Sequence, residues 1–201
     1  MDNITGIIDY GEAGNIASIK KALLACNAEV KIIYDPLHIS SCKRLILPGV
    51  GAFNSAMEIL SKKGWTEKIK EFSKTKPILG ICLGMQILSK VGFEFGETNG
   101  LDLLNAEVKL ISCKGSVPHI GFKKIYITKE CKLLKNINYS DEFYFMHSYE
   151  VINYTDITAL CNHSSHTFVC AVEKNNVYGV QFHPEKSRKA GITILKNFIS
   201  L

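Results

Sequence analysis

The sequence lacks the features of membrane, secreted and nucleic-acid-binding proteins. Its 201 residues contain no apolar run as long as a membrane span, and no basic leader followed by an apolar stretch and a small-residue cleavage site. The net charge is +5, but lysine and arginine are spread among acidic residues and form no basic stripe interleaved with aromatics. We therefore expect a cytoplasmic protein that binds neither membranes nor nucleic acids.

Cysteine pairs at recognisable spacings are also missing. The seven cysteines are an odd set, which in a reducing compartment indicates free thiols. The stretch from Cys161 to His166 brings one cysteine and two histidines close together in sequence, but a polar loop explains it as well as any zinc pattern, so we expect no metal. Average hydrophobic content, 46%, and the absence of repeats or linkers predict one ordered domain over residues 1–201.

What the sequence does contain is an alternation of apolar runs and amphipathic stretches, typical of strand–helix–strand units. In the first half it predicts strands at 3–11, 30–34, 44–49 and 77–82, and helices at 14–26, 52–63 and 65–74. Asn15 is the expected N-cap of the first helix. Beyond Glu107, β-branched and aromatic residues predict strands at 107–111, 123–128, 142–151, 157–162, 168–174 and 177–182, a hairpin turn at Asn175–Asn176, and a helix at 189–201. We expect an α/β fold with a mostly parallel central sheet flanked by helices, and an additional antiparallel β region in the C-terminal half.

The stretch GICLG places Cys82 between Gly80 and Gly84, where a buried strand meets a helix expected at 83–90. This pattern is typical of a sharp turn that exposes a nucleophile at the carboxyl end of a strand. The start of the helix favours a thiolate, and its free N–H groups can bind an oxyanion. The alternative is a buried cysteine beside incidental glycines.

A cysteine nucleophile needs a base and a group that orients the base. His183 follows an apolar strand, and Glu185 lies two residues later, so we expect His183 to take the thiol proton and Glu185 to hold the imidazole. In LPGVGAF, the turn Gly49–Val50–Gly51 offers N–H groups that, with the amide of Leu83, can stabilise an oxyanion. Taken singly, a histidine after a strand and a glycine turn before a helix also have ordinary structural explanations.

Together, GICLGMQ, LPGVGAF and FHPEKS resemble the class I glutamine amidotransferases, whose fold is flavodoxin-like. IDYG, VPHIGF and HSY resemble, within that family, the glutaminase subunits of imidazole glycerol phosphate synthases. The resemblance implies hydrolysis of glutamine to glutamate and ammonia through a thioester on Cys82, with His183 and Glu185 completing a triad and no cofactor or metal. It further implies that glutamine is held by Gln86, Glu94, Ser148 and Tyr149.

The resemblance also implies a heterodimer with a (β/α)8-barrel cyclase, which uses the ammonia to make imidazole glycerol phosphate and an aminoimidazole carboxamide ribotide in histidine biosynthesis. Its interface would include Pro118, the pair Phe122–Lys123 and Lys186. The sequence departs from the family pattern twice, by one extra residue in DYGEAGN and by Phe122–Lys123 in place of Trp-Asn. An alternative is therefore a paralogous glutaminase that supplies ammonia for amidino-sugar synthesis in surface glycans.

Two further classes stay open on the residues alone. A cysteine hydrolase or peptidase on the same sheet would keep Cys82 and His183 but would not need Gln86 or the HSY strand. A non-catalytic adaptor that only binds a barrel partner would tolerate loss of Cys82, His183 or Glu185, and all three are present.

Overall fold

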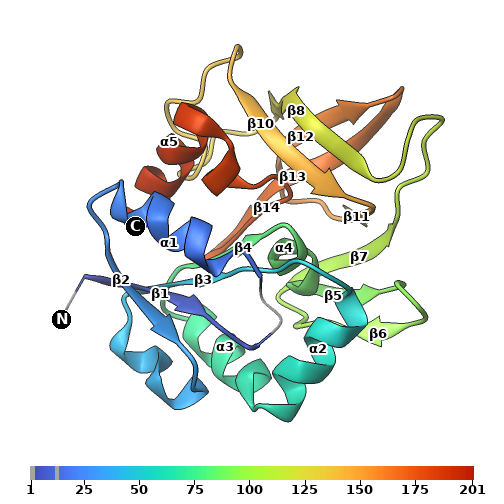
Figure 1. Ribbon diagram of the computed structural model, residues 1–201. Helices are drawn as coiled ribbons and strands as arrows, with labels where there is room; N and C mark the ends of the chain where they lie inside the picture. Colours follow the sequence, from blue (N-terminus) through green and yellow to red (C-terminus); the bar gives the residue numbers. More distant parts are fainter. Residues whose placement is uncertain (1–2, 12–13) are drawn as a thin grey trace.

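The main sheet is mixed, with a parallel half and an antiparallel half. The computed structural model describes residues 3–11 and 14–201, and within them this sheet has eight strands in the order β2-β1-β3-β4-β14-β13-β12-β9 (Figure 1). Neighbours from β2 to β14 run parallel, and those from β14 to β9 run antiparallel. The strands are β1 (Ile4–Ile8), β2 (Glu29–Ile33), β3 (Arg44–Leu47), β4 (Ile78–Ile81), β9 (Tyr126–Ile127), β12 (Ile157–His163), β13 (His166–Lys174) and β14 (Val177–Val180). The parallel half has the strand order of a flavodoxin-like sheet.

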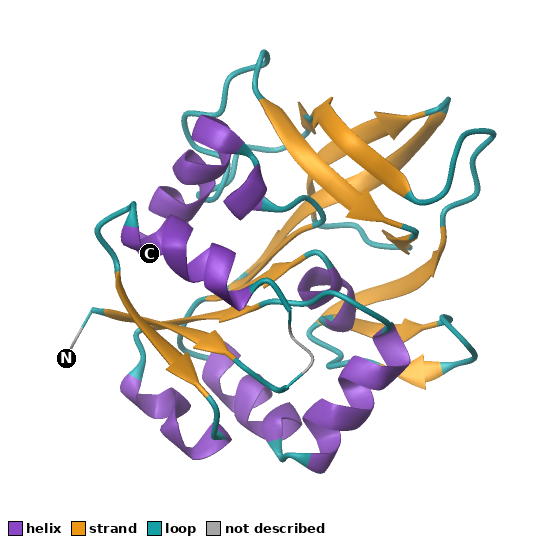
Figure 2. Cartoon of the chain, viewed as in Figure 1, coloured by secondary structure: helices purple, strands orange, loops and turns teal. Residues whose placement is uncertain are grey.

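Helices cover both faces of the parallel half (Figure 2). The side chains of β3 alternate between the two faces. Leu45 and Leu47 pack into one buried cluster with α2 (Phe53–Lys62) and α3 (Trp65–Ser73). Ile46 packs into a second cluster, on the other face, with α1 (Ile16–Leu24) and α5 (Arg188–Ile199). A strand that is apolar on both faces is buried between two helical layers. No helix in the described parts of the chain is long and apolar enough to cross a membrane.

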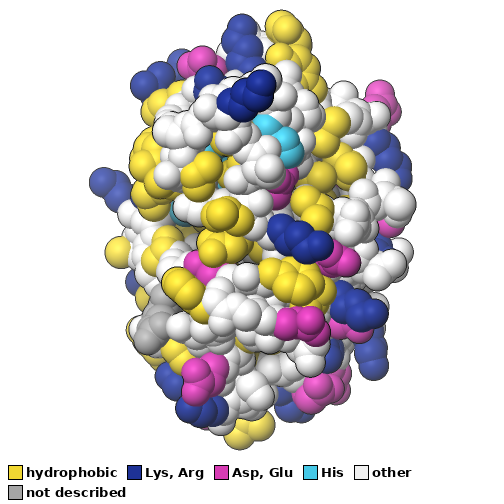
Figure 3. All heavy atoms as spheres, turned by 90° about the vertical axis from the view of Figure 1, so that its right-hand side faces the viewer, with side chains coloured by type: hydrophobic (Ala, Val, Ile, Leu, Met, Phe, Trp, Pro, Cys, Tyr) yellow, Lys and Arg dark blue, Asp and Glu magenta, His cyan; other side chains and the backbone are white. Residues whose placement is uncertain are grey.

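Two smaller sheets lie to the right of the parallel half in Figure 1. One contains β11 (Tyr149–Ile152), β7 (Leu104–Leu110), β5 (Ser89–Gly92) and β6 (Thr98–Asn99), and the other pairs β8 (His119–Lys124) with β10 (Glu142–His147). On this side of the molecule hydrophobic and charged side chains are mixed (Figure 3). Three short helical segments complete the fold: α4 (Leu83–Ile87) and the 3₁₀ turns η1 (Pro36–Ser41) and η2 (Pro184–Lys186).

The predicted α/β class is confirmed, and the predicted elements of the first half recur within a few residues at their ends. The hairpin is also confirmed, because Lys174 pairs with Val177 and Asn175 has φ 55°. The stretch DYGEAGN, which carries the extra residue, includes residues 12 and 13, and these lie outside the described residues. All seven cysteines are free thiols, as predicted.

Three element predictions were wrong. The helix after Cys82 ends at Ile87, because the chain then enters β5 and pairs with β7. The predicted strand 142–151 breaks at Ser148 into β10 and β11, which belong to different sheets. The predicted strand 123–128 breaks in the same way between β8 and β9. In each case, pairing with distant strands overrides local propensity.

Candidate active site

The candidate catalytic residues follow three neighbouring parallel strands. β4 lies between β3 and β14, with Leu47 beside Gly80 and Val180 beside Ile81. Parallel strands bring their carboxyl ends to one edge of the sheet, where ligands of such folds bind. At this edge β3 leads into the turn Gly49–Gly51, β4 into Cys82, and β14 into His183.

Cys82 sits in a strained backbone conformation on a tight turn. Its φ is 54° and its ψ is −112°, a combination that is costly for any residue with a side chain. A Cβ on Gly80 would come within 2.5 Å of Gly84 O, and one on Gly84 within 1.9 Å of Leu47 O. The two glycines are therefore required because backbone segments meet here, which agrees with the nucleophile turn predicted from the sequence.

His183 and Glu185 form a buried pair. The side chains are 1% and 0% exposed, and His183 Nδ1 lies 2.8 Å from Glu185 Oε1. Burial acts to lower the pKa of His183, but hydrogen bonding and charge interactions with Cys82 and Glu185 outweigh it and raise that pKa to about 9. Nδ1 is taken up by Glu185, so Nε2, which has no geometrically defined hydrogen bond among the described residues, is the ring nitrogen left to exchange a proton with Cys82.

The main chain around His183 is held by a serine that the sequence did not point to. Ser187 Oγ donates to His183 O at 2.6 Å and accepts from Tyr144 N at 2.9 Å. His183 N in turn donates to Tyr144 O at 2.8 Å. The segment after β14 is thereby tied to β10, which fixes the position of the imidazole.

Asn15 plays a different part from the one predicted. It stands at the N-cap position of α1, but its φ is 62° and its side chain makes no capping hydrogen bond. Instead Asn15 Nδ2 donates to Glu185 Oε1, the oxygen that also accepts from His183. The predicted N-cap position is confirmed, but the side chain has another role, because local propensity cannot reveal a partner 170 residues away in the sequence.

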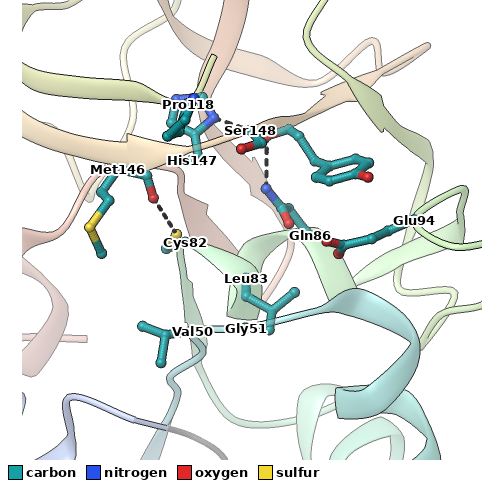
Figure 4. A pocket seen from close by; sticks show the side chains of 11 residues that line it. Val50, Gly51, Cys82, Leu83, Gln86, Glu94, Pro118, Met146, His147 and Ser148 are labelled. Carbon is teal, nitrogen blue, oxygen red and sulfur yellow. Dashed lines mark hydrogen bonds between the residues drawn. The ribbon is translucent and has the colours of Figure 1, made fainter.

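A cavity of about 220 Å³ opens beside Cys82, and its size suits a ligand as small as an amino acid. Figure 4 shows that Val50, Gly51 and Leu83 line it from one side, Pro118, His147 and Ser148 from the other, and Gln86 and Glu94 from a third. The Cys82 sulfur points to Met146 O, at 3.7 Å. The remaining lining residue is Tyr149, so every predicted glutamine-binding residue lies on this cavity.

Gln86 and Glu94 are both held by main-chain groups. Gln86 Nε2 donates to Tyr149 O at 2.9 Å. Glu94 Oε2 accepts from Phe53 N at 2.7 Å, where the positive end of α2 favours a carboxylate. Their positions are therefore set before any ligand enters the cavity.

The predicted oxyanion turn is only partly exposed to the cavity. Val50 and Gly51 line it and Gly49 does not, because Gly49 packs against α4, where a Cβ would lie 2.8 Å from Leu83 Cβ. Gly51 has φ 105°, which favours glycine. Leu83 is the first residue of α4, so its N–H has no acceptor within that helix and can donate to an oxyanion.

Two buried histidines support the cavity wall. His147 Nδ1 donates to the carbonyl of Tyr149 at 2.9 Å, and its Nε2 lies 3.2 Å from Nδ1 of His119, which is therefore the donor in that contact. Desolvation lowers the pKa of His147 to about 3 and that of His119 to about 4, so both are neutral. HSY was recognised as a family motif, but local sequence did not reveal this pairing, which joins β8 to β10.

Of the predicted interface residues, Pro118 lines the cavity, Lys186 follows His183 in η2, and Phe122 and Lys123 lie on β8. The guanidinium of Arg188 lies 4.3 Å from the centre of the Phe122 ring, and Lys186 Nζ lies 5.6 Å from that of Tyr144. Phe122 and Tyr144 contact each other edge to face. Lys123 is exposed on the same strand as Phe122.

The residues that raised a metal interpretation have other partners. Cys161 is fully buried, His163 Nε2 contacts Ser116 O at 2.9 Å, and His166 Nε2 contacts Glu150 Oε1 at 2.7 Å. In the described part of the chain no group of three metal-ligating side chains comes together.

The fold and this site define a class of enzyme. The family model "Glutamine amidotransferase class-I" matches residues 7–201, and the chain belongs to that family of enzymes. Within it the chain is HisH-like: it is 43% identical to "Imidazole glycerol phosphate synthase subunit HisH" of Desulfitobacterium hafniense (strain DSM 10664 / DCB-2), over 96% of this chain and 92% of the relative. The HisH protein of Aquifex aeolicus (strain VF5) is 41% identical over 96% and 95%.

Solved structures agree on the fold. PurLQS from Thermotoga maritima superposes with a TM-score of 0.77 at 15% identity, covering 100% of this chain and 99% of that one. At this identity the likeness concerns the fold alone. The predicted fold class is thus confirmed by the sheet and by its structural neighbours.

Proposed function

We propose that this chain is the glutaminase subunit of an imidazole glycerol phosphate synthase, hydrolysing glutamine at Cys82 and passing the ammonia to a HisF-like (β/α)8-barrel cyclase. The observation that carries the chemistry is the meeting of a strained cysteine and a buried His–Glu pair at adjacent strand ends. The similarity to HisH subunits over nearly the full chain supports the biosynthetic role.

In the first half-reaction the proton of the Cys82 thiol is held on His183 Nε2, a transfer that the raised pKa of His183 favours, and the sulfur attacks the side-chain amide carbon of glutamine. The negative charge moves to the carbonyl oxygen, where the N–H groups of Leu83 and of the Gly49–Gly51 turn stabilise it. As the C–N bond breaks, His183 returns its proton to the leaving nitrogen. Ammonia leaves, and a γ-glutamyl thioester remains on Cys82.

In the second half-reaction a water molecule gives a proton to His183 and adds to the thioester carbon, which releases glutamate and restores the thiol. Glu185 stabilises the imidazolium and fixes the imidazole through Nδ1. Gln86 and Glu94, with the Ser148–Tyr149 backbone, hold the amino-acid end of glutamine against the cavity wall.

The partner subunit is proposed to dock beside His183. Free ammonia is mostly ammonium at neutral pH and is not nucleophilic, so delivery within an interface keeps it reactive. Pro118, Phe122, Lys123 and Lys186 are the residues proposed to meet the partner, and the exposed cations of Lys123 and Lys186 favour an acidic partner surface. The cyclase closes the imidazole ring with this ammonia. The free cysteines support a reducing location, and we place the protein in the cytoplasm.

One observation favours a second candidate. Phe122 and Lys123 replace the Trp-Asn pair of the family, and Arg188 stacks on Phe122, so the surface offered to a partner is altered while the cavity is complete. A paralogous glutaminase that feeds amidino-sugar synthesis would retain the same chemistry with a different barrel partner.

Transfer of nitrogen from amide-labelled glutamine separates the two candidates. With the histidine-pathway cyclase of the same organism and its ribotide substrate, we expect the label to appear in imidazole glycerol phosphate. Label in the product from wild type, and none from the Cys82→Ala variant, supports the proposal. Intact thioester formation without transfer contradicts the histidine-pathway role and leaves the paralogue.

Phe122 and Lys123 are expected to tune partner choice. In the double variant Phe122→Trp, Lys123→Asn, the Arg188 stack is repacked and one cation is lost, so the Kd for the histidine-pathway cyclase should change by about tenfold. Titration calorimetry measures this, with Lys62→Asn on α2 as the control for a lost surface charge. Unchanged affinity and unchanged activation would refute the role.

A further inference from the structure

Gln181 occupies a position between the catalytic strands that no step above uses. It follows β14 directly, its side chain is completely buried, and its backbone N–H continues the pairing with β13 through Cys170 O at 2.9 Å. Both ends of its amide have partners: Oε1 accepts from Gln86 Nε2 at 3.1 Å, and Nε2 donates to Cys82 Sγ at 3.7 Å.

The surrounding hydrogen bonds determine which way this amide faces. Tyr149 O can only accept, so the Gln86 atom that contacts it must be the nitrogen. The same nitrogen contacts Gln181, which must therefore present its oxygen to Gln86. The NH₂ group of Gln181 is left facing the sulfur, as the network requires.

The thiolate needs such a donor. Cys82 is only 6% exposed, so an anion formed there has little water to solvate it. The helix expected to stabilise it over residues 83–90 ends at Ile87, and two of its early N–H groups, those of Met85 and Gln86, bond to Cys82 O. A hydrogen bond to a charged acceptor is about twice as strong as one between neutral groups.

We propose that Gln181 is a further catalytic residue, whose Nε2–H donates to the Cys82 sulfur and stabilises the thiolate that attacks glutamine. Gln86 is then a positioning residue for it, since Gln86 fixes the orientation of the Gln181 amide. This role rests on the proposed function for its place in turnover, but the contact itself acts on the free enzyme before any substrate binds.

The test is the reactivity of Cys82 in the isolated chain. Iodoacetamide alkylates thiolates, and digestion with mass spectrometry resolves Cys82 from the other six cysteines. In Gln181→Met, which keeps the volume and removes the donor, the alkylation rate of Cys82 at neutral pH should fall about tenfold. Thr158→Val, which removes a buried hydroxyl on β12, is the matched control and should leave the rate unchanged.

A second variant distinguishes loss of the hydrogen-bond donor from misfolding. Gln181→Glu keeps the shape and the Gln86 contact but places a carboxylate beside the sulfur, so its alkylation rate should fall further below wild type as the pH rises from about 6 to 9. With partner and glutamine, both variants should lose kcat with KM nearly unchanged. Wild-type alkylation rates in either folded variant would overturn the role. Because alkylation needs neither glutamine nor a partner, this result does not depend on whether the proposed function holds.

Discussion

Replacement of Cys82 by alanine or serine is expected to lower kcat for glutamine hydrolysis by at least about 10⁴-fold, because the group that forms the covalent bond is removed. Serine retains a hydroxyl, but a hydroxyl loses its proton far less readily than a thiol. His183 Nε2 is basic enough to deprotonate a thiol but not a serine hydroxyl. The cavity is otherwise preserved. Synthesis by the cyclase from added ammonium should therefore continue at the wild-type rate.

The two activities are measured on the same complex, with glutamate release from glutamine and imidazole glycerol phosphate formation from ammonium as readouts. Unfolding would remove docking as well, so retained ammonium-dependent synthesis together with unchanged binding of the partner is the internal control. Glutamine turnover above the background in either variant would contradict the assignment of Cys82 as nucleophile.

The sequence was informative about Cys82 because the chemistry and the backbone impose the same local pattern. Two glycines flank the nucleophile because a Cβ on either one would collide with backbone atoms. Such a constraint is local in sequence and can be recognised there. The apolar strands that carry Cys82 and His183 were predicted for a similar reason, since each is buried on both faces.

Asn15 and Gln181 were missed because their roles depend on contacts that are distant in sequence. Asn15 lies at a helix start, where its residue type already has a sufficient local explanation, and its contact with Glu185 is visible only in the fold. Gln181 looks in the sequence like the end of an apolar strand, and only the register of β14 with β4 brings it beside the sulfur. The break at Ser148 was missed likewise, because pairing with β7 decides it.

Glu185→Gln is expected to lower kcat by roughly 10²- to 10³-fold, less than loss of Cys82, because Glu185 orients the base and makes no bond to substrate. Asn15 limits the loss of kcat in this variant. Its NH₂ can only donate, so it selects the oxygen of the new amide for the position now held by Glu185 Oε1. His183 Nδ1–H still finds an acceptor there, and Nε2 remains the basic nitrogen.

What the variant loses is the charge, and this gives a signature in the pH profile. Burial lowers the pKa of His183, and the Glu185 carboxylate is one of the groups that raise it to about 9. Without that charge the pKa of His183 falls. Protonated His183 is needed to expel ammonia, so activity declines as pH rises through this pKa, and the alkaline limb of kcat/KM should move to lower pH in Glu185→Gln.

Rates measured between about pH 6 and pH 10 test this shift. The double variant Asn15→Ala, Glu185→Gln is the comparison, because without the Asn15 donor the amide is free to present its NH₂ to Nδ1 and force the wrong tautomer. Its kcat should fall below that of Glu185→Gln alone. A Glu185→Gln profile that keeps the wild-type alkaline limb would show that the carboxylate does not hold the proton on His183, and loss of activity equal to that of Cys82→Ala would contradict the orienting role.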